Sequence, residues 1–209
     1  MTAKAIVKNR IEEYDIIKCL AIIMIVVGHS GCPDYLRSLV YWIHVPLFFY
    51  ISGCTNRKDE YYANSCNVFE FIKKRIKTLY LPFLKYAIPI ILLHNVLYSW
   101  GWYDTNFTVA EYGKQLARTL VLSIGDEEPL LKHLWFIKTL FLAEILYAIL
   151  LYVLQKLHVR KWYVILPLGV MAYVINISSL PHVFSSNLIW PLRALLLYSL
   201  PQLVGGGYL

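Results

Sequence analysis

Charged residues are scarce in this sequence. They make up 16% of its 209 residues, whereas soluble domains contain about 25%. In addition, 58% of the residues are hydrophobic, and the mean hydropathy is +0.53. This composition excludes an ordinary soluble domain. Because apolar segments recur along the whole chain, it also excludes a single membrane anchor, and we predict an all-α, polytopic transmembrane helical bundle.

Cys-x-x-Cys pairs and internal repeats are also lacking. The four cysteines lie at positions 19, 32, 54 and 66, and no two of them form a Cys-x-x-Cys pair. This spacing gives no cysteine metal site and no evident disulfide framework, so we expect no metal. No repeat of 20–50 residues is visible in the sequence.

Six apolar segments have lengths near the roughly 20 residues that a helix needs to cross a bilayer. They cover about residues 14–31, 38–53, 79–98, 134–154, 162–177 and 183–204. Most of the six tryptophans lie near the ends of these segments, as is typical of side chains at the membrane interface. The sequence therefore predicts about six spans in this chain.

Basic residues are distributed unevenly between the loops. If the N-terminus lies inside, the inner segments contain twelve Lys and Arg residues, the outer loops four, and the spans the remaining four. The positive-inside rule then predicts a cytoplasmic N-terminus. The net charge of +7 is explained by these loops, and we expect no nucleic-acid partner.

The first apolar segment has polar groups only near its ends. Lys18 and His29 are eleven positions apart, so in a helix they share a face and lie about 16 Å apart along the axis. Asp15 comes three positions before Lys18, close enough to pair with it. Two interpretations remain open: these groups anchor the helix ends at the lipid headgroups, or they face a wet cavity and do chemistry there.

The longest outer loop runs from Tyr103 to Lys132. Its apolar piece, residues 116–124, is expected to lie on the membrane surface. The acidic run that follows it, which ends at Glu128, is interpreted as solvated rather than as a site.

Four motifs occur along the chain in the order found in one family of membrane enzymes. They are Asp15-Ile-Ile-Lys18 through Gly28-His29; Ile43-His44-Val-Pro46 through Ser52-Gly53; Lys74-Arg75-Ile-Lys77 through Pro82; and His133-Leu-Trp135 through Phe141. In these motifs the chain resembles the acyltransferase-3 family of integral membrane acyltransferases, and within it the fucose 4-O-acetylase-like group. Family members are longer, so residues 1–209 are expected to form a single membrane acyltransferase domain that is incomplete at its C-terminus.

The resemblance implies transfer of an acetyl group from acetyl-CoA to a carbohydrate hydroxyl, on a cell-surface polysaccharide or its lipid-linked precursor, in a bacterial plasma membrane. His29 would act as the base, or would relay the acetyl group as an acyl-imidazole, with Asp15 grouped as a second catalytic residue. Lys18 stands where the broad family has arginine. Lys18, Arg75 and Trp135 would bind acetyl-CoA, while His44 and Ser52 would line the acceptor cavity.

Simpler roles remain open for several of these residues. Arg75 fits ordinary positive-inside charge, and Trp135 fits an interface anchor. His44 fits a packed, hydrogen-bonded histidine, and Ser52 fits a hydroxyl bonded to its own helix backbone. For the whole chain, the alternatives are a transporter or exporter, which should show internal two-fold repetition, and an inactive truncated membrane fragment.

Overall fold

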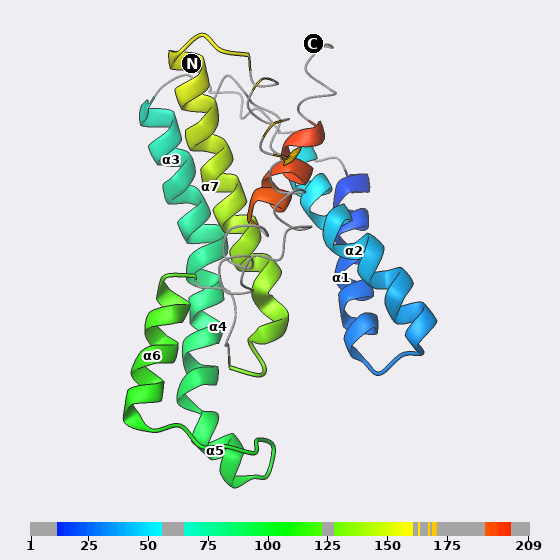
Figure 1. The fold of residues 1–209 in the computed structure, drawn as a ribbon, viewed down its shortest axis with the longest axis vertical. Helices are drawn as coiled ribbons and strands as arrows, with labels where there is room; N and C mark the ends of the chain where they lie inside the picture. Colours follow the sequence, from blue (N-terminus) through cyan, green and yellow to red (C-terminus); the bar gives the residue numbers. More distant parts are fainter. Residues whose placement is uncertain are drawn as a thin grey trace, which may run out of the picture. The chain divides into compact units, whose positions relative to one another are not determined.

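The computed structural model describes residues 12–55, 65–122, 128–160, 163, 167, 169–170 and 191–201. Within these ranges every regular element is a helix, which confirms the prediction of an all-α fold for this part of the chain (Figure 1). The chain divides into two units, Met1–Arg57 with Leu200–Leu209, and Lys58–Ser199.

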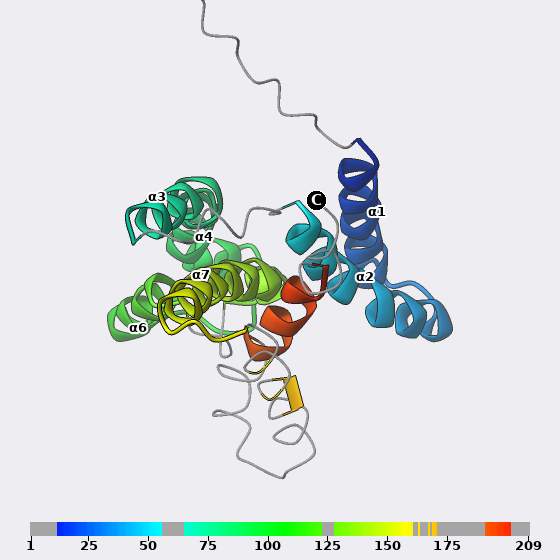
Figure 2. The same ribbon diagram turned by 90° about the horizontal axis from the view of Figure 1, so that it is seen from above.

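The first unit is built on a helical hairpin of α1 (Glu12–His29) and α2 (Asp34–Cys54), which lie side by side in both ribbon views (Figures 1 and 2). Acidic residues in the first turn of α1 favour its positive N-terminal end. Gly31 forms the turn with a φ of +77°, which glycine adopts without steric cost. Ala21 and Gly28 are the buried residues of α1, and their small size lets the two helices approach closely.

The second unit begins with α3 (Ser65–Arg75), a π-helical segment η2 (Ile76–Tyr80) and α4 (Leu81–Leu92), which follow each other without a break. Pro82 explains why this segment is π-helical, with wider turns than an α-helix. Proline has no N–H, and in a regular α-helix its ring would collide with the carbonyl four residues earlier, that of Thr78. In the structure the Leu81 N–H instead reaches back five residues to Ile76 O.

Three helices follow along the chain: α5 (His94–Ser99), α6 (Val109–Leu120) and α7 (Trp135–Lys156), the last preceded by the short 3-10 turn η3 (Lys132–Leu134). Thr108 and Glu111 start α6 with a capping box, in which each side chain accepts the other residue's backbone N–H. The hydrogen bond from the Thr108 N–H holds the pKa of the exposed Glu111 carboxyl below its usual value. Glu111 therefore carries its charge at the positive end of α6.

One face of α4 forms the centre of the second unit's core. Phe83, Ala87 and Ile91 are buried at four-residue spacing, and Leu122, Leu131 and Phe141 pack against them. Leu116 of α6 also packs on this core, while Leu120 and Val121 are 50% and 73% exposed. The expectation that residues 116–124 lie together on a membrane surface is therefore wrong for Leu116 and Leu122, which face inward.

Among the described helices, α7 alone is long and apolar enough to cross a membrane. It coincides with the segment predicted at residues 134–154. The segment predicted at 79–98 is not one helix, because it begins inside η2 and is interrupted at Leu93 between α4 and α5. Residues 162–177 lie largely outside the described part of the chain, as does much of 183–204, and six spans are not confirmed.

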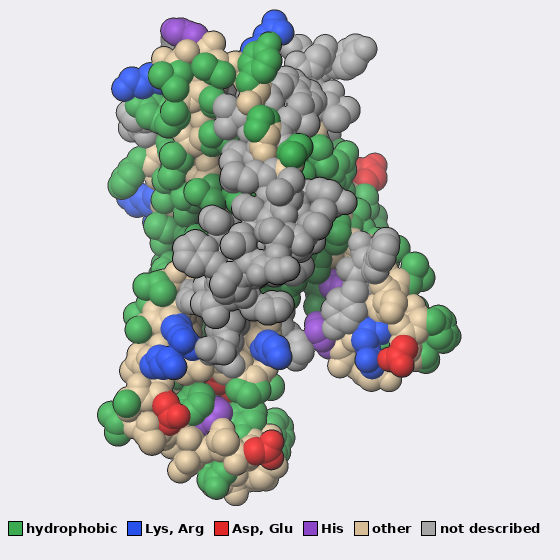
Figure 3. Space-filling view, in the orientation of Figure 1, with side chains coloured by type: hydrophobic (Ala, Val, Ile, Leu, Met, Phe, Trp, Pro, Cys, Tyr) green, Lys and Arg blue, Asp and Glu red, His purple; other side chains and the backbone are tan. Residues whose placement is uncertain are grey.

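Large apolar side chains are nevertheless exposed along several helices. On α1 these include Ile16, Leu20, Ile23 and Val26, each 48–62% exposed. In the second unit, Figure 3 shows hydrophobic side chains spread over the face formed by α3 and α7. Such extensive apolar exposure is costly in water and fits helices that contact lipid.

Candidate functional site

Helix α1 is unbroken from Glu12 to His29, so it carries Lys18 and His29 on one face, about 16 Å apart along its axis. His29 is the last residue of the helix and is exposed, while Lys18 is partly buried. Asp15 lies about 21 Å from His29 along the same axis, too far to orient its ring. Any contribution of Asp15 therefore acts at the Lys18 end of the helix.

Lys18 is held by the C-terminal end of α2. Its ammonium group donates a hydrogen bond to Thr55 Oγ1 at 3.2 Å, and the Thr55 hydroxyl donates to Ser52 O at 2.9 Å. The last turn of α2 contains no basic residue of its own, so Lys18 supplies the positive charge that a helix C-terminus favours. The buried Ser52 hydroxyl donates a hydrogen bond to Phe48 O at 2.7 Å. Ser52 is thus bonded to the backbone of its own helix, as the simpler interpretation of this residue predicts.

His44 is buried on α2, with 2% of its surface exposed. Its Nδ1 lies at hydrogen-bond distance from Val40 O. Because a carbonyl oxygen can only accept, Nδ1 must carry the hydrogen, and in the neutral ring the lone pair is then on Nε2. The backbone thus fixes the tautomer of a neutral His44, with the hydrogen on Nδ1.

Arg75 ends α3 and forms an ion pair with Glu144 of α7. Its Nε lies 3.0 Å from Glu144 Oε2, without the alignment of a hydrogen bond, and its guanidinium stacks 5.0 Å from the Phe71 ring centroid. The Glu144 side chain is 2% exposed and the Arg75 side chain 22%. Sequence reasoning missed this ion pair, because its two members lie on different helices.

Trp135, the other residue expected to bind the donor, is the first residue of α7 and is partly buried. Its carbonyl accepts the Thr139 hydroxyl at 3.0 Å. Arg75 and Trp135 thus belong to the second unit, whereas Asp15, Lys18, His29, His44 and Ser52 belong to the first. Within the described ranges, no three His, Cys, Asp or Glu side chains gather as metal ligands would.

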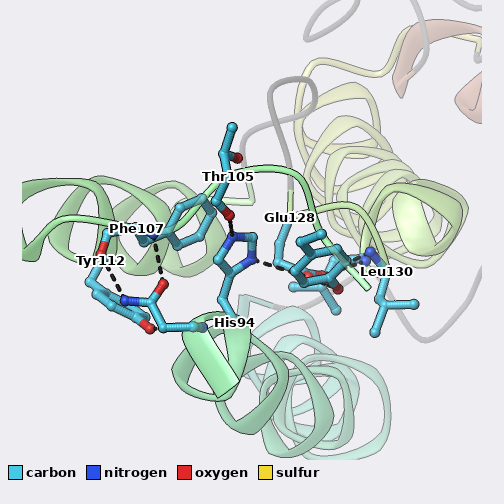
Figure 4. Close-up of polar contacts among 9 residues, drawn as sticks. His94, Thr105, Phe107, Tyr112, Glu128 and Leu130 are labelled. Atoms are coloured by element: carbon cyan, nitrogen blue, oxygen red, sulfur yellow. Dashed lines mark hydrogen bonds and ion pairs between the residues drawn. The ribbon is translucent and has the colours of Figure 1, made fainter. Parts of the chain in front are cut away.

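A second polar cluster, around His94 and Glu128, was missed by sequence reasoning (Figure 4). Glu128 is 1% exposed, so its interpretation as a solvated charge is wrong. Its Oε2 accepts the N–H groups of Leu130 and Leu131 at 2.9 and 3.1 Å, and its Oε1 accepts the Tyr103 hydroxyl. The position of Glu128 directly before Pro129 could have indicated this role. Carboxylates at the start of a helix often accept the unpaired backbone N–H groups there.

Burial raises the pKa of the Tyr103 hydroxyl above its ordinary value, and the hydrogen bond to Glu128 and the charge of this carboxylate raise it further. Tyr103 therefore stays protonated and remains a donor at physiological pH. The cluster joins the loop after α5 to the segment that leads into α7.

A family model described as an acyltransferase domain matches residues 11–209. The chain belongs to the acyltransferase-3 family. A comparison with curated proteins finds no match, and a comparison with solved structures finds none. Membership of the acyltransferase-3 family establishes an acyltransferase domain in a membrane setting, with an acyl donor and an acceptor, and it confirms the family resemblance seen in the four motifs.

Proposed function

We propose that this chain is a membrane O-acetyltransferase of the fucose 4-O-acetylase-like group. It moves an acetyl group from acetyl-CoA to a carbohydrate hydroxyl on a cell-surface polysaccharide or its lipid-linked precursor. The observation that carries this proposal is helix α1, which holds an ammonium group and an imidazole on one face in a chain of the acyltransferase-3 family. The protein acts as a multi-pass protein of the plasma membrane, with its N-terminus in the cytoplasm where acetyl-CoA is found.

His29 supplies the proton transfer in this reaction. Its neutral imidazole takes the proton of the acceptor hydroxyl as the hydroxyl oxygen attacks the thioester carbon. The tetrahedral intermediate then expels the CoA thiolate, which takes the proton from the imidazolium. In the alternative route the acetyl group passes first to the ring nitrogen, as an acyl-imidazole, and then to the acceptor.

The spacing along α1 supports separate roles for its two groups. At about 16 Å, the Lys18 ammonium cannot reach an atom that His29 contacts. Acetyl-CoA is extended, with the thioester at one end and phosphates at the other, so Lys18 acts on the phosphate part. Arg75 and Trp135 contribute to binding the donor, by charge and by stacking, while His44 and Ser52 line the acceptor side.

The decisive experiment incubates the purified, detergent-solubilised protein with radiolabelled acetyl-CoA and fucose as the probe acceptor. We expect release of free CoA together with label on the sugar. A helical, monodisperse preparation that releases no CoA, with or without the sugar, would contradict the enzymatic proposal. Release of CoA without labelled fucose would keep an acyltransferase and exclude fucose as the acceptor.

Thr55 provides a test of the role of Lys18. Replacing Thr55 by valine removes the hydroxyl that accepts the Lys18 hydrogen bond while keeping the branched shape. Since a hydrogen bond to a charged group contributes about 1.5–3 kcal/mol, we expect the KM for acetyl-CoA to rise about tenfold or more, with kcat little changed. Thr55→Ser, which keeps the hydroxyl, is the control and should restore the KM. An unchanged KM in Thr55→Val would show that the hydrogen bond between Lys18 and Thr55 has no role in binding acetyl-CoA.

A further inference from the structure

The imidazole of His94 is enclosed between two aromatic rings. The Phe107 ring lies parallel to it, with centroids 3.5 Å apart and 5° between the planes, and the Tyr103 ring lies on the other side at 4.5 Å and 25°. His94 is 1% exposed. Its Nε2 lies 3.1 Å from Thr105 O, and its Nδ1 lies 3.6 Å from Glu128 Oε1 (Figure 4).

The hydrogen positions in this cluster follow from its donors and acceptors. Glu128 accepts three hydrogen bonds, from the Tyr103 hydroxyl and from two backbone N–H groups, as an ionised carboxylate does. Thr105 O can only accept, so Nε2 of His94 carries a hydrogen. A neutral ring would then turn the lone pair of Nδ1 toward the Glu128 carboxylate, which is repulsive. A doubly protonated ring places an N–H there, and its charge is favourable between two aromatic faces.

We propose that His94 and Glu128 form a proton-dependent latch. With the ring doubly protonated, the latch fixes the Tyr103 loop and the segment that enters α7 against α5. When the ring loses the Nδ1 hydrogen, the ion pair is lost, and Glu128 no longer holds the Leu130 and Leu131 N–H groups in one fixed arrangement. The latch therefore holds at lower pH and opens as the pH rises.

Asn95 limits the extent of this opening. Its side-chain amide donates to Phe107 O at 2.9 Å and accepts the Phe107 N–H at 2.7 Å. These two hydrogen bonds involve no titrating group, so the Phe107 end of the loop stays attached to α5 at all pH values. The change is confined to Tyr103, Glu128 and the residues before α7.

Among the described residues, the carboxylate of Glu111 also favours a positive charge on His94. Glu111, at the start of α6, interacts electrostatically with His94, and Thr108 keeps its carboxylate ionised. Tyr103 stays protonated, because burial and Glu128 raise its pKa.

The test is amide hydrogen exchange of Leu130 and Leu131 in the whole protein in detergent, corrected for intrinsic exchange, over a series of pH values. We expect their protection to fall about tenfold across this series as the pH rises, while the Phe107 amide stays protected. His94→Phe keeps the aromatic stack and should show low protection at all pH values, and Glu128→Gln should remove the pH dependence.

The hydrogens of the ring can be observed directly without any variant. We expect the ¹⁵N NMR shifts of the His94 side chain to show both nitrogens protonated at the acidic end of the same pH series. A singly protonated ring at this acidic end would overturn the latch, as would protection of Leu130 and Leu131 that does not change with pH. A His94→Phe variant that retained the wild-type pH dependence would equally contradict it.

Discussion

Replacement of His29 by alanine is expected to lower acetyl transfer by about 10²–10⁴-fold, the contribution of a positioned general base. The protein should remain folded and in the membrane, because His29 is exposed at the last position of α1. CoA release from labelled acetyl-CoA measures the loss, and circular dichroism in detergent confirms the helix content.

His158→Asn is the matched control for this variant. His158 is also exposed, just beyond the end of α7, and asparagine accepts its positive φ of 55°. Its activity should equal that of the wild type. Full activity in His29→Ala would exclude His29 as both base and relay. Label that stays on the protein after rapid quenching of the wild type, and is absent from His29→Ala, would select the acyl-imidazole route.

The second large effect is expected at the ion pair between α3 and α7. Arg75→Met should lower the free energy of unfolding by about 3–5 kcal/mol, because it removes the guanidinium from a carboxylate that is 2% exposed. The double variant Arg75→Met with Glu144→Gln should recover most of this loss, since the charge is removed with its partner. Unfolding by denaturant in detergent measures both.

The double variant also separates stability from donor binding. If Arg75 contacts a phosphate of acetyl-CoA, the refolded double variant keeps its stability but shows a raised KM for the donor. Lys74→Ala is the control, because Lys74 is an adjacent, exposed basic residue that carries the same topology signal. Wild-type stability in Arg75→Met would show that the ion pair contributes little, and a wild-type KM in the double variant would remove Arg75 from the donor site.

The sequence predicted those parts of the fold that depend on local pattern. The apolar run at 134–154 became α7, and the first segment became an unbroken α1, because an apolar periodicity specifies a helix without reference to the rest of the chain. The segment at 79–98 is not one helix, partly because of the π-helical turn before Pro82 and partly for a non-local reason. His94 is buried against the loop that carries Tyr103 and Phe107, and this contact is not visible in the local sequence.

The same distinction holds for the candidate site. The shared face of Lys18 and His29 was predictable, because helix geometry converts a spacing of eleven residues into a direction. The interaction partners were not predictable. Lys18 donates a hydrogen bond to Thr55, which follows the last residue of α2, and Arg75 forms an ion pair with Glu144 of α7. A spacing within one helix carries no information about which side chain a second helix will bring to it.

The π-helical turn at Ile76–Tyr80 allows the continuous helix α3–η2–α4 to make two different contacts. Each residue added to a helix rotates every later side chain by about 100°, so a locally altered winding resets the angular phase between the two halves. Upstream of it, Arg75 is aimed at the buried carboxylate of α7, and downstream, Phe83, Ala87 and Ile91 are aimed at the apolar core. A proline near a helix start thus decouples an electrostatic contact from a hydrophobic one, and each can be aligned without compromising the other.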